Sequence, residues 1–228
     1  MPITNLGRIC MTSQFEEFAA ALDAAFFRYA HLGGALEFYM FVLETPGLQH
    51  AVNRSLSAPE TDWKEIHRFM AIDGERITWY PSVPISEVLA QRNALMGFLY
   101  GVTLSSLVGD LDFYLASVLR VHFARNDSTG SAWDAFVSST GIALLDLPNG
   151  LLIYTLLQER HKIVHNNGRI DERLLARLGR QGISDPRNVG DPIQKSHLDI
   201  LHSFNLIRAF AEKVDRDVSV VLANRSGV

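Results

Sequence analysis

The chain has little of what secreted, metal-stapled or membrane proteins need. Among 228 residues Cys10 is the one cysteine, which excludes an internal disulfide and a cysteine-based zinc site and favours a reducing compartment. The N-terminus lacks the basic start and apolar block of a signal peptide. The longest uncharged run, 93–109, is just under the length of a spanning helix and contains Gly97 and Gly101. These absences predict a cytoplasmic protein without a membrane anchor.

Several enzyme signatures are absent as well. The sequence has no phosphate-binding loop of the form G-x(4)-G-K-[ST], no G-x-S-x-G nucleophile elbow and no H-E-x-x-H zinc motif. It has no internal repeat and no low-complexity tract. No cofactor and no metal are expected, and the net charge of −4 argues against indiscriminate nucleic-acid binding.

Helical periodicity dominates what remains, and evidence for strands is thin, so the predicted fold class is all-α. We expect a helical bundle with long central and C-terminal helices over residues 86–228 and an N-terminal helical extension or lobe over 1–85. Arg76 to Pro81 is expected to be extended or irregular, and 179–191 a loop or small hairpin. The expected helices are 14–43, as one kinked helix or two separated at Gly33-Gly34; 60–70; 87–124, capped by Ser86; a short helix capped by Ser131; 149–166; 171–178; and 193–222.

The most unusual stretch is Gln158 to Gly168, QERHKIVHNNG, which follows the apolar run 151–157. Asn167-Gly168 is a natural helix stop, because both residues tolerate the left-handed conformation. Five residues at 100° each place Arg160 and His165 about 140° apart on a helix, whereas His161 and His165 share a face. A site that uses Arg160 and His165 together therefore needs the helix to end there, or a symmetric dimer that brings two copies together.

A histidine can move a proton near neutral pH, and an arginine can hold phosphate oxygens. This pair suits cleavage of RNA by the neighbouring 2′-hydroxyl without a metal, with His165 as acid or base and Arg160 stabilising the charge on phosphorus. His161 would position the phosphate or the arginine. Asn166 is a supporting candidate, and Asp110 or Asp112 would orient a basic residue of the motif.

Arg160 to His165 resembles the R-x(4-6)-H signature of the HEPN superfamily (higher eukaryotes and prokaryotes nucleotide-binding domains). The polar residue after the arginine, His161, and the apolar residue before the histidine, Val164, both fit that signature. The resemblance is sharp over about a dozen residues and architectural over 86–222. It implies an all-helical, usually dimeric protein, often a metal-independent endoribonuclease that acts as a toxin or in defence against phage, with Arg160 and His165 catalytic.

One departure from the family concerns its regulation. Some family toxins carry a tyrosine two residues past the histidine, which a partner enzyme modifies, and here that position is Asn167. An antitoxin or regulatory protein remains an expected partner, besides RNA and a second copy of the chain. Lys162 and Arg169 are predicted to bind the RNA backbone, because basic residues exceed acids between Gln158 and Arg187.

Two alternatives stay open. The motif could bind a nucleotide or a protein partner without turnover, or it could be structural, with Arg160 as a surface or buried partner of an acid and the histidines near a helix C-terminus. For the remaining histidines a structural role is favoured: His31, His50, His67, His122, His197 and His202.

Overall fold

The computed structural model describes residues 11–45, 47–48, 66–73, 76–125 and 132–226. The chain divides into two compact units, one formed by residues 1–27 with 100–228 and the other by 28–99. This division differs from the predicted boundary at residue 85, because the first helix, α1 (Ser13–Glu44), contributes residues to both units. The candidate motif lies entirely in the first of them.

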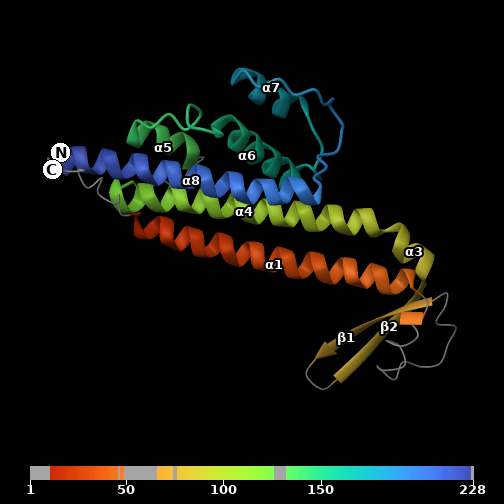
Figure 1. The fold of residues 1–228 in the computed structure, drawn as a ribbon. Coiled ribbons are helices and arrows are strands. Elements are labelled where there is room, and N and C mark those ends of the chain that lie inside the picture. The colour runs from red at the N-terminus through yellow and green to blue at the C-terminus, as the bar shows by residue number, and fades with distance from the viewer. Residues whose placement is uncertain (1–10, 46, 49–65, 74–75, 126–131, 227–228) are drawn as a thin grey trace, which may run out of the picture. The chain divides into compact units, whose positions relative to one another are not determined.

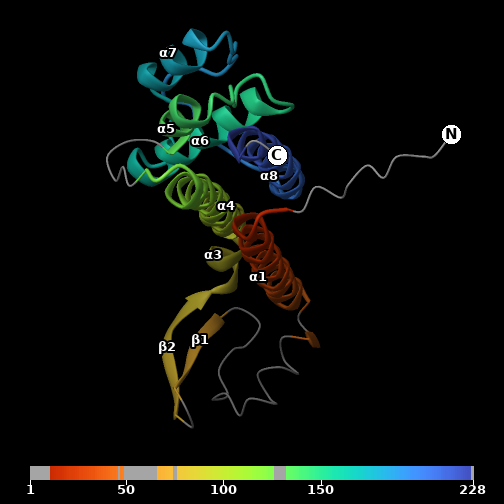
Figure 2. The same ribbon diagram turned by 90° about the vertical axis from the view of Figure 1, so that its left-hand side faces the viewer.

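The first unit is a helical bundle organised around two long helices, α4 (Arg92–His122) and α8 (His197–Ser226), which run side by side (Figures 1 and 2). The first part of α1, up to Phe27, belongs to it, together with three shorter helices: α5 (Ala132–Thr140), α6 (Gly150–His165) and α7 (Glu172–Arg180). Apolar residues recur at helical spacing on α4 and α8, and their burial supplies the main stabilisation of the unit. The fully buried side chains on these two helices include Leu104, Leu107, Leu111, Leu115, Ile207, Phe210, Val214 and Val218.

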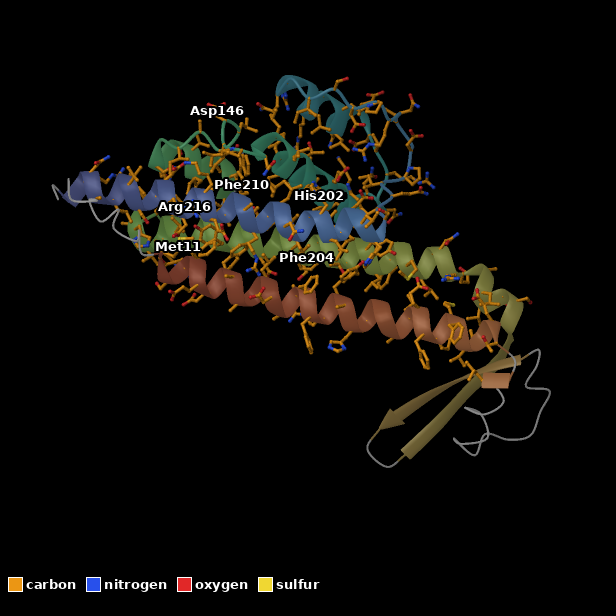
Figure 3. All side chains as sticks on the ribbon, viewed as in Figure 1. Met11, Asp146, His202, Phe204, Phe210 and Arg216 are labelled. Atoms are coloured by element: carbon orange, nitrogen blue, oxygen red, sulfur yellow. The ribbon has the colours of Figure 1, made fainter. Side chains whose placement is uncertain are left out.

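One buried carboxylate connects three helices of this unit. Asp215 on α8 is fully buried, and it accepts hydrogen bonds from the Tyr114 hydroxyl on α4, at 3.1 Å, and from the Thr12 N–H before α1, at 2.9 Å. Nearer the start of α8, the Phe204 ring packs edge to face against Phe26 of α1, and the Phe210 ring stacks on Trp133 of α5 (Phe204 and Phe210 are labelled in Figure 3). Polar and aromatic contacts together therefore fix the position of α8 in the bundle.

The second unit combines helix with a two-stranded hairpin. Strand β1 (Ile66–Asp73) pairs antiparallel with β2 (Arg76–Pro84), and the ladder has an irregularity between Arg68 and Met70. Helix α3 (Ile85–Ala90) follows at once, and Val88 packs with Met40 and Leu43 of α1. The Arg92 guanidinium bonds Glu37 at 2.5 Å and Glu44 at 3.2 Å.

The all-α class is confirmed, since helices make up the regular structure of the described residues apart from this hairpin. The helix predicted over 60–70 is wrong from Ile66 onward, where the chain forms β1, and its first residues lie outside the described part. The extended prediction for Arg76 to Pro81 is confirmed by β2. Gly33-Gly34 does not break α1.

Other helix limits differ by a few residues from the prediction. Ser86 is not a cap, because α3 begins at Ile85 and a turn at Gln91 separates it from α4. The C-terminal helix begins at His197 instead of Ile193. The predicted cap Ser131 lies outside the described residues.

Among the described helices, α4 is long and apolar enough to cross a membrane by length and composition. The core helix of a soluble protein passes the same test, and α4 carries buried residues from Thr103 to Leu119.

Candidate functional site

Helix α6, which carries the motif, is held tightly at both ends. Asn149 adopts a left-handed conformation (φ 67°) and Gly150 follows so closely against the backbone of Leu144 that a Cβ there would lie 2.2 Å from the Leu144 carbonyl oxygen. At the other end Asn167 and Gly168 are both left-handed, with φ of 48° and 66°. The predicted helix stop is therefore confirmed, and α6 ends at His165.

His161 and His165 lie together on the exposed face of α6. Their ring centroids are 4.8 Å apart, as the i, i+4 spacing predicts. Within the described part of the chain neither ring forms a hydrogen bond or an ion pair, so both imidazoles are available to a ligand. Partial burial, followed by the charges of His165, Lys162, Arg177 and Arg160, lowers the pKa of His161 below its ordinary value, which favours the neutral, proton-accepting ring.

Arg160 lies on a different side of α6 and does not contact His165. Its side chain is half-buried, and its Nε atom is buried without a hydrogen-bond partner among the described residues. Its charge acts on Asp112 of α4: burial raises the pKa of that carboxyl, and Arg160 opposes the rise. The helical offset of about 140° calculated from the spacing therefore persists in the folded chain.

Asp112 is an acid whose pKa is influenced by the charge of Arg160. Asp110 and Asp112 are two positions apart on α4. Such residues lie about 200° apart around a helix, so their side chains point to opposite sides. Asp110 lines a shallow groove between α1 and α4 together with Gln14, Glu17 and Phe18. The supporting role predicted for Asp110 stays a prediction, and Asp112, the other acid considered, is the one on which the charge of Arg160 acts.

The residue next to Arg160 in sequence builds a buried ionic network that the motif gave no reason to expect. Glu159 is only 2% exposed, and its two carboxylate oxygens lie 2.7 Å from Nη1 of Arg187 and 2.6 Å from Nζ of Lys195. Arg187 also bonds Asp185 through two of its nitrogens, at 2.8 and 2.6 Å. The network attaches the segment between α7 and α8 to the inner face of α6.

A sequence signal for Glu159 did exist. It continues the buried face of α6, which recurs every three residues at Ile153, Leu156, Glu159 and Lys162. A carboxylate at such a position is almost never buried without a cationic partner. The pattern could have shown that a partner was needed, but not that Arg187 and Lys195 supply it.

Lys162 serves the fold in this chain. It is 7% exposed, and its Nζ donates to Asp171 Oδ2 at 2.6 Å. Asp171 also caps α7, because its Oδ1 accepts from the Leu174 N–H at 2.8 Å. An RNA phosphate would have to break this ion pair to bind Lys162, so the predicted RNA-binding role is not favoured.

Asn166 and Arg169 shape the turn between α6 and α7. The Asn166 side chain donates to the Arg169 carbonyl at 2.9 Å, and the Gly168 N–H donates to the Lys162 carbonyl at 3.0 Å. The exposed Arg169 guanidinium donates to the Gly190 carbonyl at 2.8 Å, a neutral acceptor that leaves its charge available. Arg169 thus lies just after the end of α6 that carries the histidines, where its predicted RNA-binding role stays a prediction, and Asn166 stabilises the turn.

No family model, no curated protein and no solved structure matches the chain. The site consists of an exposed histidine pair near the cations Lys162 and Arg177, with the half-buried Arg160 on another side of α6. Such a group can exchange protons with a ligand and attract an anion.

Proposed function

We propose that the protein is a metal-independent endoribonuclease that cleaves single-stranded RNA at a site shared by two copies of the chain. The observation that carries this proposal is the exposed, unbonded pair His161 and His165 in a cationic environment. One neutral imidazole removes the proton from the 2′-hydroxyl, whose oxygen attacks phosphorus. The bond to the 5′-oxygen breaks, and a protonated imidazole supplies the proton to that leaving oxygen. The products are a 2′,3′-cyclic phosphate and a 5′-hydroxyl.

His165 is the catalytic histidine of this proposal, and Arg160 stabilises the charge on the phosphate. Because Arg160 and His165 of one chain do not meet, the arginine comes from the partner copy. Exposed apolar side chains on α6 and on the neighbouring part of α4 provide a surface that a second copy could cover. These are Leu151, Leu152, Val164 and Val102, each 44–51% exposed. The protein would then serve as a toxin or an anti-phage defence protein.

The direct test is cleavage of a labelled single-stranded RNA by the full chain in chelator. His165→Ala and Arg160→Ala should each lower the rate by about 10²-fold or more, the usual contribution of a general base or a charge-stabilising group. His202→Ala and Arg216→Ala are matched controls, because both residues are exposed and belong to α8, outside the motif helix (both are labelled in Figure 3). Absence of cleavage by the parental chain, or parental rates in both motif variants, would contradict the proposal.

Mixing the two inactive variants tests the shared site. If subunits exchange, about half of the dimers are mixed, and each of these holds one site with an intact arginine and histidine from different chains. The mixture should then recover about a quarter of the parental activity. A mixture that stays inactive although the subunits have exchanged would show that each chain must hold both residues.

A second candidate function is a non-catalytic module that binds a nucleotide or a protein partner. The position of Arg160 favours it, because a half-buried arginine that lies away from the histidine pair suits structure better than catalysis. Binding of a nucleotide without loss of RNA in the same assay would identify this alternative.

A further inference from the structure

Three arginines form a row on the outer face of α7. Arg173, Arg177 and Arg180 follow the i, i+4, i+7 spacing that places side chains on one face of a helix, and all three are exposed. About 110° further round the helix, Leu174 and Leu178 are buried. At 1.5 Å per residue the row extends about 10 Å along the helix axis. We call these residues the α7 arginine row.

The α7 arginine row interacts with an acid at its first member, because the charge of Arg173 helps to lower the pKa of Asp171. Within the described part of the chain none of the three forms an ion pair, and Arg177 donates to the neutral amide oxygen of Gln158 at 3.0 Å. Glu172, at the start of α7, is the exposed acid of this segment. The other acids nearby already have cationic partners, namely Glu159 and Asp185 with Arg187 and Asp171 with Lys162.

The α7 arginine row is continuous with the candidate site. The hydrogen bond from Arg177 to Gln158 joins α7 to the exposed side of α6, one turn before His161. The charge of Arg177 is among those that lower the pKa of His161, after burial and the charges of His165 and Lys162. Figure 1 shows α7 beside the C-terminal half of α6. An anion held along α7 would therefore extend toward the two imidazoles.

We propose that the α7 arginine row binds the phosphate backbone of the RNA strand and leads it to His161 and His165; this inference rests on the proposed function. A row of about 10 Å spans roughly three phosphates at about 3.4 Å per nucleotide of a stacked strand. Helix α7 has no aromatic residue for base stacking. The binding is therefore electrostatic, independent of base sequence and strongly dependent on salt.

The test measures RNA binding separately from cleavage. In a His165→Ala background, the fluorescence anisotropy of a labelled single-stranded RNA is titrated from about 50 to about 200 mM salt. Replacing the α7 arginine row by Arg173→Gln, Arg177→Gln and Arg180→Gln should lower the salt slope by about 2, since each phosphate contact contributes about 0.7. The parental affinity should consequently fall roughly 20-fold more than that of the variant across this range.

A control variant carries the same change in charge elsewhere. Arg28→Gln, Arg120→Gln and Arg216→Gln replace three exposed arginines outside α6 and α7. This control should keep the parental slope to within about 0.7, one phosphate contact. Circular dichroism of both variants checks that the helices are retained.

The outcomes separate this inference from the proposed function. If the wild-type chain cleaves RNA and the α7 variant binds with the parental slope, the inference is wrong and the proposed function stands. If wild type does not cleave but binding depends on the α7 arginine row, the inference survives alone. Binding of poly-glutamate through the α7 arginine row in place of RNA would assign the surface to an acidic protein and overturn the inference.

Discussion

Replacing Glu159 with glutamine should destabilise the bundle more than any exposed charge change. The carboxylate is almost fully buried on α6 and bonds two cations, Arg187 and Lys195, from the segment between α7 and α8. Glutamine keeps the shape of the side chain but removes its charge. Both cations then remain near an interior position without the negative charge that offset their desolvation.

The magnitude follows from the exposure of the partners. Removing one member of a buried ion pair costs about 3–5 kcal/mol. Here the cost is reduced, because the Arg187 side chain is 29% exposed and retains Asp185 as a second partner. We expect a loss of about 2–3 kcal/mol, which corresponds to a fall in Tm of about 5–10 °C for a chain of this size.

Urea denaturation followed by circular dichroism measures the loss, and hydrogen exchange locates it. Amides of residues 183–196 should lose protection first, because Glu159 attaches this segment to α6. Glu17→Gln is the control, an exposed acid on α1 that should change stability by less than about 0.5 kcal/mol. If Glu159→Gln and Glu17→Gln have equal effects, the reasoning about the buried network is refuted.

Two further predictions concern single positions in the same unit. Gly150→Ala should lower the free energy of unfolding, measured by urea denaturation, by about 3 kcal/mol or more, because its Cβ would lie 2.2 Å from a backbone oxygen. Gly109→Ala, with open space around that position, should raise this free energy by about 0.5–1 kcal/mol. Equal effects of the two substitutions would refute this prediction. The ion pair with Lys162, helped by the Leu174 N–H and opposed by burial, lowers the pKa of Asp171 in the folded chain. The contribution of this ion pair to stability is therefore complete above the pKa of about 3.9 that Asp171 has in the unfolded chain. It is lost as the pH falls through the lower pKa that Asp171 has in the folded chain. Asp171→Asn, which keeps a capping oxygen, should remove this pH dependence, and an unchanged acid profile in that variant would contradict the assignment.

Local signals in the sequence were sufficient for α6 and the turn after it. The left-handed conformations of Asn167 and Gly168 depend on those residues alone, so the end of the helix was predictable. The spacing of His161 and His165 likewise gave their proximity. These two features of α6, both set within a few residues of each other, were thus predicted correctly.

Features that depend on distant partners were not predicted. Ile66 has helical spacing from Trp63, but pairing with β2 makes 66–73 a strand. Gly33-Gly34 suggested a break, yet two glycines cost only about 1 kcal/mol each within a helix as long as α1. The ionic partners of Glu159 lie 28 and 36 residues away, beyond the range of any periodicity.

The positions of the charged groups also sharpen what the catalytic proposal requires. In a single chain Arg160 is half-buried and the histidine pair is exposed, and the exposed arginine whose charge reaches His161 from a neighbouring helix is Arg177. If mixed Arg160→Ala and His165→Ala chains recover activity, the phosphate is held by the partner's arginine and the row on α7 only delivers the strand. If they do not, and Arg177→Gln alone lowers the cleavage rate at saturating RNA, the working arginine comes from α7 of the same chain.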